Sequence, residues 1–284
     1  TAICEKSCRG RQLPSRTRAR SCIDDGELFE AMTMTGRGRR LNLPDGHAHL
    51  WWTRPSAFTD VSELTRYRAL LSDDERKKTD RYRFARDRHT CLVTRTLVRV
   101  TLSRYCDVAP AQWRFRAGAY GRPEIVGPNS SLCFNLSHTR GLIVCLVSRG
   151  REVGVDVESL DRGHRWLELA ERFFAPREAA ALRRVPPGDR ASRFLEYWTL
   201  KEAYIKARGL GLKIPLNGFW FDLPVVPLED VRINFTPAVN DNSSRWSCGS
   251  ERLGTGHVVA TVVERHHSDR VRITRHDVGG PLME

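Results

Sequence analysis

Two acidic side chains separated by one valine stand in a short segment, residues 152–158, whose pattern is that of a β-strand. Successive side chains of a strand point to opposite faces, so Asp156 and Glu158 share one face while the valines occupy the other. Two neighbouring carboxylates repel each other unless water or a cation stabilises them, and hard oxygen ligands suit Mg²⁺. An ordinary amphipathic strand also alternates valine with acid, so this segment alone leaves both interpretations open.

A second group of chemically capable side chains follows in a segment with helical periodicity. Trp198 and Ile205 are seven residues apart and form an apolar seam, while Glu202 and Lys206 are four apart and lie on one face. An exposed pair of this kind is usually a surface ion pair worth about 0.3–0.5 kcal/mol. Combined with the two strand carboxylates, however, it completes a set of three acids and a lysine, which can hold Mg²⁺ and neutralise a reacting phosphate.

Basic side chains gather on a segment with helical periodicity, residues 84–105. Arg88, Arg95 and Arg99 recur at steps of seven and four residues, which puts three guanidinium groups along one stripe. Residues 76–104 contain ten basic residues and two acidic ones. A charge run is usually a solvated helix face, but few acids here neutralise the excess, so anion binding and a solvated face both stay open.

Two further segments place polar residues at turns. Gly-Arg-Pro at residues 121–123 lies in a turn-rich stretch. Ser137 and His138 stand between two short apolar runs, 132–136 and 141–147, each typical of a buried strand. A polar cluster at a strand end is a common binding loop and is also what an ordinary hairpin looks like. Both interpretations remain open from the residues alone.

The two acid-bearing segments together resemble the paired signature of the 4′-phosphopantetheinyl transferases. The first is Gly-Val-Asp-Val-Glu at residues 154–158, and the second is Trp-Thr-Leu-Lys-Glu-Ala-Tyr-Ile-Lys at residues 198–206. Either motif alone is a weak signal, whereas both in this order and at this spacing are specific. Three upstream segments are also similar to the longer, Sfp-type members: Gly-Arg-Pro at 121–123, Phe-Asn-Leu-Ser-His at 134–138 and the pattern of residues 71–99. The resemblance covers approximately residues 47–215.

This resemblance implies an α+β fold built as a pseudo-dimer of two similar α+β halves, with coenzyme A bound in the cleft between them. The shorter, trimeric holo-acyl-carrier-protein synthase type has one such unit per chain, so a length of 284 residues favours the two-unit, monomeric form. By similarity, the Mg²⁺ ligands facing the coenzyme A pyrophosphate are Asp156, Glu158 and Glu202. The catalytic residues implied are Glu202 as the base, and Lys206 with Lys201 to balance charge on the phosphate oxygens.

The resemblance also implies a set of coenzyme A contacts. They are Ser137 and His138 at the phosphates, Arg122 near the nucleotide, and Arg88 and Arg95 at the 3′-phosphate. In the Sfp-type pattern an arginine directly follows a histidine, whereas Thr90 follows His89 here. Which arginine compensates for this departure is left open.

The reaction implied by the resemblance joins two substrates. A serine hydroxyl of an apo acyl or peptidyl carrier protein attacks the phosphorus that bears the pantetheine arm of coenzyme A, and 3′,5′-adenosine bisphosphate leaves. A chain of net charge +13 attracts the acidic surface of such a carrier at low salt. We expect a cytoplasmic enzyme that acts as a monomer and has no nucleic-acid partner.

Composition sets the limits within which these residues must be positioned. The chain is 40% hydrophobic and 29% charged, which supplies the cores of one large or two modest domains and excludes whole-chain disorder, collagen and a coiled coil. The longest apolar run, residues 141–147, is far shorter than the ~18 residues that cross a bilayer. Eight cysteines without any Cys-x-x-Cys spacing indicate a reducing compartment.

The elements that must position these residues divide the chain into four parts. We expect a basic, disordered extension at 1–43, an N-terminal α+β half at 44–150, a C-terminal α+β half carrying the metal site at 151–264, and a loose polar tail at 265–284. Strands are expected near residues 47–52, 132–136, 141–147, 152–158, 219–221, 231–235 and 257–263. Helices are expected to start at Ser72 with the capping partner Glu75, and to cover 84–105, 166–174, a segment opening at Pro176, and 193–208.

Two other classes of protein use similar residues. A Mg²⁺-dependent nuclease also combines acids, a lysine and a basic surface, but its usual Glu-x-Lys order places the lysine two residues after the acid, whereas Lys206 lies four after Glu202. A non-catalytic nucleic-acid-binding protein is suggested by a pI of about 9.8 and by nine basic residues within 1–40. The sequence contains no zinc finger or RNA-binding motif that supports it.

Overall fold

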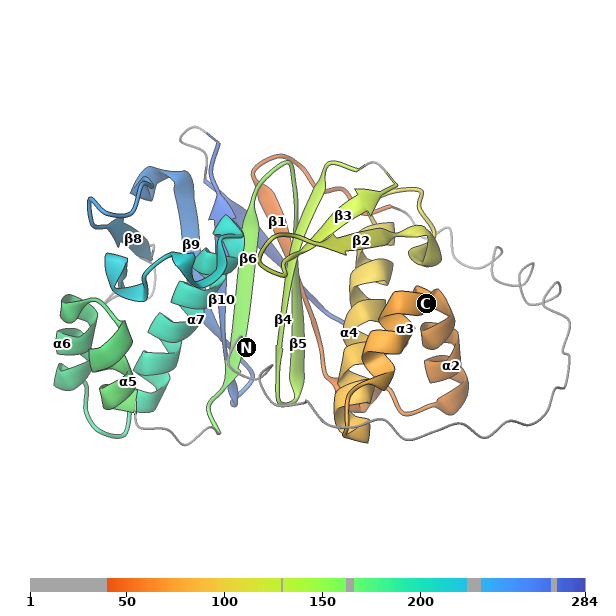
Figure 1. Cartoon of the computed structure of the whole chain (residues 1–284), viewed down its shortest axis with the longest axis horizontal. Helices are drawn as coiled ribbons and strands as arrows, with labels where there is room; N and C mark the ends of the chain where they lie inside the picture. Colours follow the sequence, from red (N-terminus) through yellow and green to blue (C-terminus); the bar gives the residue numbers. More distant parts are fainter. Residues whose placement is uncertain (1–39, 129, 162–165, 224–230, 267–269, 284) are drawn as a thin grey trace, which may run out of the picture. The chain divides into compact units, whose positions relative to one another are not determined.

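One order of elements runs twice along the chain. Within the described residues, each half consists of a strand followed by three helices and then by four strands. The computed structural model describes residues 40–128, 130–161, 166–223, 231–266 and 270–283, and Figure 1 shows how the elements follow one another. This duplication confirms the α+β pseudo-dimer implied by the resemblance.

The elements of the first half are β1 (His47–Thr53), α2 (Val61–Leu70), α3 (Asp73–Asp80), α4 (Ala85–Ser103), β2 (Arg114–Ala117), β3 (Pro123–Gly127), β4 (Leu132–Thr139) and β5 (Leu142–Arg149). Those of the second half are β6 (Val153–Ser159), α5 (Trp166–Phe173), α6 (Pro176–Arg184), α7 (Arg190–Arg208), β7 (Phe219–Asp222), β8 (Arg232–Phe235), β9 (Trp246–Leu253) and β10 (His257–Glu264). A further strand, β11 (Arg272–Asp277), follows them. Single 3₁₀ turns lie at Pro55–Ala57, Pro110–Gln112, Gly211–Lys213, Leu216–Gly218 and Ser243–Arg245.

Local sequence signals set the helix boundaries. Helix α3 begins with the predicted capping box, in which the Ser72 hydroxyl accepts from the Glu75 amide and the Glu75 carboxylate accepts from the Ser72 amide. Helix α6 begins with Pro176, whose missing N–H would have no partner in the first turn anyway. Helix α7 ends at Gly209, which adopts a left-handed conformation with φ 63° that favours glycine. The predicted helices are therefore confirmed.

Each half has its own main sheet, and all strand pairs in these two sheets are antiparallel except the parallel pair of β11 with β1. The first has the strand order β11-β1-β5-β4 and the second has the order β6-β10-β9, while β2–β3 and β7–β8 form separate hairpins. Strands β1 and β6, which open the two halves, pair antiparallel with β5 and β10, the last strand of the same half. The predicted strands are confirmed, whereas β2, β3, β9 and β11 were not predicted. The segment after Asn135 is not a loop, because β4 continues to Thr139 and only Arg140 and Gly141 form the turn.

Three apolar clusters hold the sheets and helices together. One lies between the first sheet and helices α2 and α4, and another lies between the second sheet and helices α5 to α7. The third joins the two sheets, with Leu50 and Val144 of the first half packed against Val153, Val155 and Val157 of β6. Figure 1 shows α4 and α7 on opposite sides of the strands. The valine face of β6 is therefore buried between the sheets, and its other face is turned toward α7.

A buried ion pair repeats at the same place in each half. In the first half Arg99 of α4 pairs with Glu75 at 2.5 Å and donates to the carbonyls of Pro110 and Trp113, just before β2. The second half has the same arrangement. There Lys201 of α7 pairs with Glu178 at 2.8 Å and donates to the carbonyls of Leu216 and Phe219, where β7 begins. Each pair ties the long helix to the preceding short helix and to the following hairpin.

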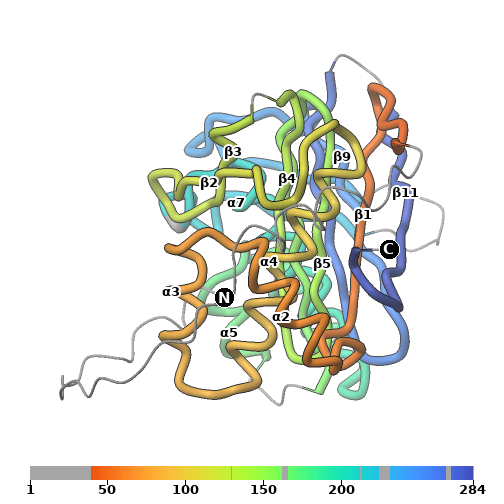
Figure 2. The backbone as a smooth tube through the Cα atoms, turned by 90° about the vertical axis from the view of Figure 1, so that its right-hand side faces the viewer, coloured from red at the N-terminus to blue at the C-terminus, as the bar shows by residue number. Residues whose placement is uncertain are grey.

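The predicted terminal segments need two corrections. Most of the predicted extension, residues 1–43, lies outside the described residues, but Leu43 is buried and the Leu41 amide donates to the Arg104 carbonyl, so the folded part begins before residue 44. The prediction of a loose tail at 265–284 is wrong. Figure 2 shows β11 beside β1, with which it pairs in parallel, and Leu282 is buried in the first core. The C-terminal segment thus completes the first half.

None of the helices within the described residues is both long enough and apolar enough to span a membrane.

Candidate functional site

The site is built on the close approach of α7 to β6. Gly154 faces α7, and a Cβ atom there would lie 1.9 Å from the Ala203 carbonyl oxygen and 2.6 Å from the Ala207 nitrogen. Only a glycine therefore permits this packing distance. Asp156 and Glu158 lie on the same face of the strand as Gly154. The helix thus carries its own polar residues directly over the two strand carboxylates.

Asp156 is the centre of the polar cluster. Its side chain is 2% exposed. One carboxylate oxygen, Oδ1, accepts from Lys206 Nζ at 2.7 Å and from Ser137 Oγ at 2.8 Å. The other oxygen, Oδ2, is buried and has no hydrogen-bond partner in the part of the chain that the structure describes. A buried carboxylate oxygen without a donor is costly and marks a place for a cation or a ligand group.

Lys206 connects three chain segments at this point. Besides Asp156, its Nζ donates to Ser137 Oγ at 2.9 Å and to the Val155 carbonyl at 3.2 Å. All three ammonium hydrogens therefore have acceptors, which fixes the side chain over β6. The lysine side chain is 20% exposed, so the charged group borders solvent and can meet an incoming anion.

Glu202 faces the same cluster from one turn earlier on α7. Burial raises the pKa of the Glu202 carboxyl, and the negative charge of Asp156 raises it further, with a smaller contribution from Glu158. Lys206 acts in the opposite direction. Asp156 and Glu158 are thus close enough to Glu202 for their charges to act on the pKa of its carboxyl.

The chemistry of this cluster fits a hard cation. Its donors are carboxylate oxygens, which Mg²⁺ prefers, and one of them, Asp156 Oδ2, has no hydrogen-bond partner among the described residues. A divalent ion would also remove the repulsion that raises the pKa of Glu202. In the described ranges, however, no group of three or more His, Cys, Asp or Glu side chains is already arranged to hold a metal ion. The assignment of Asp156, Glu158 and Glu202 as ligands therefore stays a prediction.

Strand β4 supplies the remaining polar groups. Ser137 lies between Lys206 and Asp156, as described above. Thr139, two residues on, donates to Glu158 Oε2 at 3.2 Å. His138 lies between them in sequence, where burial lowers its pKa and the charge of Lys206 lowers it further. A neutral imidazole at this position can donate or accept a hydrogen bond.

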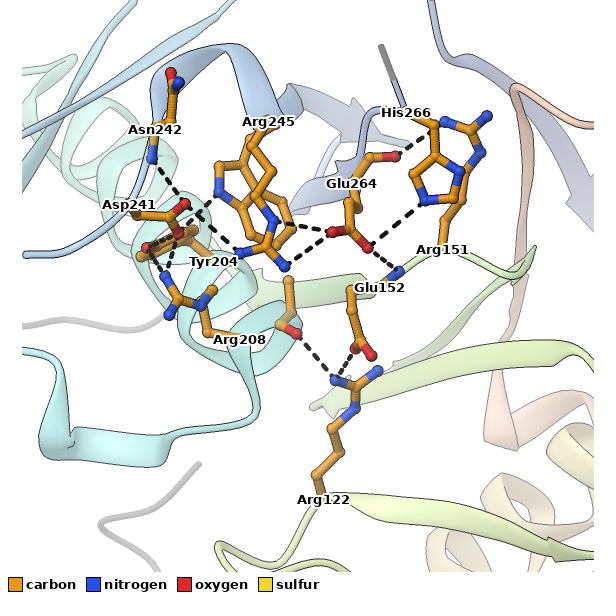
Figure 3. A network of polar contacts seen from close by, with 12 residues as sticks. Arg122, Arg151, Glu152, Tyr204, Arg208, Asp241, Asn242, Arg245, Glu264 and His266 are labelled. Atoms are coloured by element: carbon orange, nitrogen blue, oxygen red, sulfur yellow. Dashed lines mark hydrogen bonds and ion pairs between the residues drawn. The ribbon is translucent and has the colours of Figure 1, made fainter.

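Arg122 reaches the second half from the β2–β3 hairpin. Its guanidinium donates to Glu152 at 2.5 Å and to the Ala207 carbonyl at 2.9 Å, at the C-terminal end of α7 (Figure 3). A cation at this end of a helix also interacts favourably with the helix dipole. Arg122 therefore connects the β2–β3 hairpin to α7. Its contact on the helix, Ala207, directly follows Lys206 of the cluster.

The predicted 3′-phosphate contacts lie on α4 in the first half. Arg88 is half-buried and donates to the carbonyls of Tyr82 and Arg83. Arg95 is half-buried and pairs with Glu75 at 3.2 Å. The third arginine of the predicted stripe, Arg99, is 1% exposed and belongs to the buried pair with Glu75. The stripe is therefore not a row of three free guanidinium groups.

Lys201 is not brought to the cluster. Its side chain is fully buried in the second core, where it pairs with Glu178. Burial lowers the pKa of Lys201 and raises the pKa of Glu178, so both groups depend on their mutual attraction to stay charged. The structure therefore corrects the expected catalytic role: Lys201 holds α7 in place.

The first half has no equivalent cluster among the residues described. In the matching position of β1, Trp51 donates to the Tyr105 hydroxyl at 2.7 Å, and the Arg104 guanidinium lies over the Trp51 ring at 5.5 Å. Aromatic rings thus fill the space that carboxylates line in the second half. This explains why two similar halves provide one polar centre.

Three further residues near the cluster were not predicted. Asn135 and Thr139 lie on β4 and contact β6. Their alternation with Ser137 is a period of two that the sequence displays. Asp241 anchors the far side of α7 by accepting hydrogen bonds from Tyr204, Trp246 and Arg208 (Figure 3). Nothing in the local pattern signals that contact, because Asp241 lies in an irregular segment.

Comparisons with known proteins give the family. A sequence profile of the 4′-phosphopantetheinyl transferase superfamily matches residues 152–262, and a profile for the N-terminal part of 4′-phosphopantetheinyl transferases matches residues 58–150. The 4′-phosphopantetheinyl transferase HetI of a Nostoc species is 36% identical over 200 residues, covering 69% of this chain and 78% of the relative. The 4′-phosphopantetheinyl transferase Sfp of Bacillus subtilis is 31% identical over 158 residues, covering 55% of this chain and 68% of the relative.

One solved structure is similar over part of the chain. The crystal structure of holo-[acyl-carrier-protein] synthase from Thermotoga maritima matches with a TM-score of 0.33 and 20% identity, covering 41% of this chain and 64% of that one.

The chain therefore belongs to the 4′-phosphopantetheinyl transferase superfamily and is an enzyme of this class. Its duplicated order of elements and its similarity to HetI and Sfp identify the Sfp type. Neither a nuclease nor a nucleic-acid-binding protein is indicated by these matches.

Proposed function

We propose that the chain transfers the 4′-phosphopantetheine group of coenzyme A to a serine of an apo acyl or peptidyl carrier protein, with Mg²⁺, and releases 3′,5′-adenosine bisphosphate. The observation that carries this proposal is the state of Asp156. One of its oxygens is bound to Lys206 and Ser137, and the other is buried without a partner among the described residues. The family match supports the transferase chemistry.

Three carboxylates are proposed to hold the ion: Asp156, Glu158 and Glu202. Mg²⁺ bound there neutralises charge on the pyrophosphate of coenzyme A and on the leaving group. The all-oxygen donor set and the free Oδ2 of Asp156 support this choice. All three residues are at most 9% exposed, so the site excludes most water and strengthens electrostatic interactions.

Glu202 is proposed to accept the proton in this reaction, and Lys206 is proposed to stabilise the negative charge. Glu202 lies in the cluster one turn before Lys206, and it is proposed to take the proton of the attacking serine. The serine oxygen forms a bond to the phosphorus that bears the pantetheine arm, and the bond from that phosphorus to the bridging oxygen breaks. Lys206, held at the border with solvent, balances the negative charge on the phosphate oxygens.

Contacts to coenzyme A are proposed for five residues: Ser137 and His138 at the phosphates, Arg88 and Arg95 at the 3′-phosphate, and Arg122 near the nucleotide. Ser137 and His138 are supported by their position beside Lys206 and Asp156. Arg88 donates to two backbone carbonyls and is partly exposed, so its guanidinium can meet an anion. Arg95 already forms an ion pair with Glu75, and Arg122 forms one with Glu152. Each of these guanidinium groups would therefore contact coenzyme A and its carboxylate partner at the same time.

The carrier protein is proposed to approach by charge. A net charge of +13 attracts an acidic carrier and raises the association rate at low ionic strength. We further propose that the enzyme is a cytoplasmic monomer, with the metal site in its second half.

Intact-mass measurement tests the proposal directly. Purified full-length protein is incubated with coenzyme A, Mg²⁺ and a panel of apo acyl and peptidyl carrier proteins. We expect one carrier or more to gain the mass of one phosphopantetheine group, and to gain none when Mg²⁺ is replaced by a chelator. Unchanged masses across the whole panel would contradict the proposed function.

A further inference from the structure

The two halves meet where β4 of the first half runs beside β6 of the second (Figure 1). Strand β6 is at the edge of its sheet, whose order is β6-β10-β9, so its outer backbone groups lack a ladder partner from that sheet. The Val155 amide donates to Asn135 Oδ1 at 3.0 Å, and the Val155 carbonyl accepts from Lys206. Asn135 is 3% exposed, so this is a buried substitute for a strand ladder.

Side chains at alternate positions of β4 contact successive parts of β6. Asn135, Ser137 and Thr139 share one face of β4 because side chains of a strand repeat with a period of two. Asn135 binds the β6 backbone, Ser137 donates to Asp156, and Thr139 donates to Glu158. The two carboxylates of β6 are also two residues apart. The spacing of the donors on β4 therefore matches the spacing of the acids on β6.

We propose that Asn135 and Thr139 are positioning residues for the cation site: Asn135 fixes the register of β6 against β4, and Thr139 fixes the direction of the Glu158 carboxylate. This inference rests on the proposed function, because it concerns the carboxylates proposed as Mg²⁺ ligands. A glutamate side chain has several rotatable bonds, and holding it in one rotamer before an ion arrives removes an entropy cost from binding. The first half thus prepares the site of the second half.

Thr139 offers the sharper test because each of its two substitutions changes a single group of the threonine side chain. Thr139→Val keeps the branched shape and removes the hydroxyl, whereas Thr139→Ser keeps the hydroxyl. Thr274→Val, on the exposed face of β11, is the matched control for a threonine-to-valine change in a strand. The readout is the dissociation constant of Mn²⁺ alone, titrated into the full chain without coenzyme A or carrier, together with the thermal midpoint of each variant.

Loss of a group that orients a metal ligand weakens binding about 10- to 100-fold, and for a half-buried threonine we expect about tenfold. Thr139→Val should therefore bind Mn²⁺ about tenfold more weakly than the wild type at an unchanged thermal midpoint. Thr139→Ser and the Thr274→Val control should bind as the wild type does. Equal Mn²⁺ affinity of wild type and Thr139→Val would overturn the inference while leaving the proposed function intact.

Asn135→Ala provides the second arm. It leaves the Val155 amide buried without an acceptor, so we expect a lower thermal midpoint and weaker Mn²⁺ binding together. Undiminished Mn²⁺ affinity in a folded Asn135→Ala variant would overturn the part of the inference that concerns register. A wild type that binds no Mn²⁺ would overturn the proposed metal site itself, and with it this inference.

Discussion

Lys201 and Glu178 form a buried ion pair at 2.8 Å, and the pair repeats, element for element, the one that Arg99 and Glu75 form in the first half. In both halves the acid is the third residue of a short helix, where its carboxylate also accepts from the backbone amide that precedes the helix. Since the first half has no polar cluster for its arginine to serve among the described residues, the repeated arrangement is explained by packing.

This relationship predicts which substitutions of Lys201 are tolerated. Lys201→Arg should retain transfer activity, because an arginine makes the corresponding pair in the first half. Lys201→Met leaves Glu178 buried without its cation and should lower the free energy of unfolding by about 3–5 kcal/mol. Thermal and denaturant unfolding check the stability, and the intact-mass assay checks the activity. A Lys201→Met protein of normal stability that transfers nothing would restore the catalytic role.

Gly154 is predicted to control the distance between α7 and β6. Gly154→Ala places a methyl group within 1.9 Å of the Ala203 carbonyl oxygen, so the helix must move and carry Glu202 and Lys206 with it. We expect a loss of about 3 kcal/mol in stability and a strong decrease in transfer rate. Gly256→Ala is the matched control, because a Cβ atom there has no atom within 4 Å. Equal behaviour of the two variants would refute this role for Gly154.

The local order of the elements follows from signals that lie close together in the sequence. Ser72 with Glu75, Pro176 and Gly209 each mark a helix end by satisfying or removing a few backbone groups, and such signals need no tertiary partner. Strand β11 is different. Its residues, Arg272–Asp277, are mostly exposed and polar, and they form a strand because the edge of β1 offers backbone partners. That partner lies more than 200 residues earlier in the chain, so the local pattern could not reveal it.

The sequence predicts which residues belong to the polar cluster better than it predicts which residues the neighbouring side chains contact. Helical spacing places Glu202 and Lys206 on one face, and strand alternation places Asp156 and Glu158 on another, which the structure brings together. Helical periodicity also places Lys201 on a different face of the helix from Lys206, but it does not identify the residue that Lys201 contacts. Glu178 is its partner because two helices pack in three dimensions, and that packing is not encoded in the spacing of either helix alone.

The pairing of Asp156 with Lys206 predicts that the two residues act as a unit in transfer. Asp156→Asn and Lys206→Met should each lower the transfer rate at least about 100-fold while the far-ultraviolet circular dichroism stays unchanged. Because the two act together, the double variant should be little slower than either single one. Lys206→Arg keeps the charge but alters the contacts to Ser137 and Val155, so an intermediate rate is expected. Additive losses in the double variant would show independent roles.

Arg122 is predicted to stabilise the join between the β2–β3 hairpin and α7. A double-mutant cycle of Arg122→Met and Glu152→Gln, measured by denaturant unfolding, should show a coupling energy of about 1 kcal/mol, since the pair is only partly buried. If Arg122 also contacts the nucleotide, Arg122→Met raises the KM for coenzyme A, whereas Glu152→Gln does not. A coupling energy of zero would mean that the pair contributes nothing to stability.

His49 is predicted to make the first half sensitive to acid. It is 6% exposed and contacts the Tyr105 hydroxyl at 2.9 Å and His276 of β11 at 3.2 Å. The pKa of His49 is lowered from its usual 6.5 to about 4. Burial is the main cause, and the nearby His276 and His47 make smaller contributions. The unfolded chain therefore binds the proton first, so the stabilisation is complete above pH 6.5 and is lost as the pH falls toward 4.

A comparison of the wild type with His49→Asn isolates this effect, because both proteins share every other titrating group. Between about pH 7 and pH 4.5 the wild type should lose roughly 2 kcal/mol more stability than the variant. Denaturant unfolding at several pH values measures the difference. The acid-induced opening of the first half should begin at β11, because protonating His49 places a charge against His276. The His276 ring stacks on Trp51, with ring centroids 4.1 Å apart. Hydrogen exchange at residues 272–277 should therefore accelerate on acidification before exchange in β5 does. Parallel pH profiles for the wild type and His49→Asn would rule this contribution out.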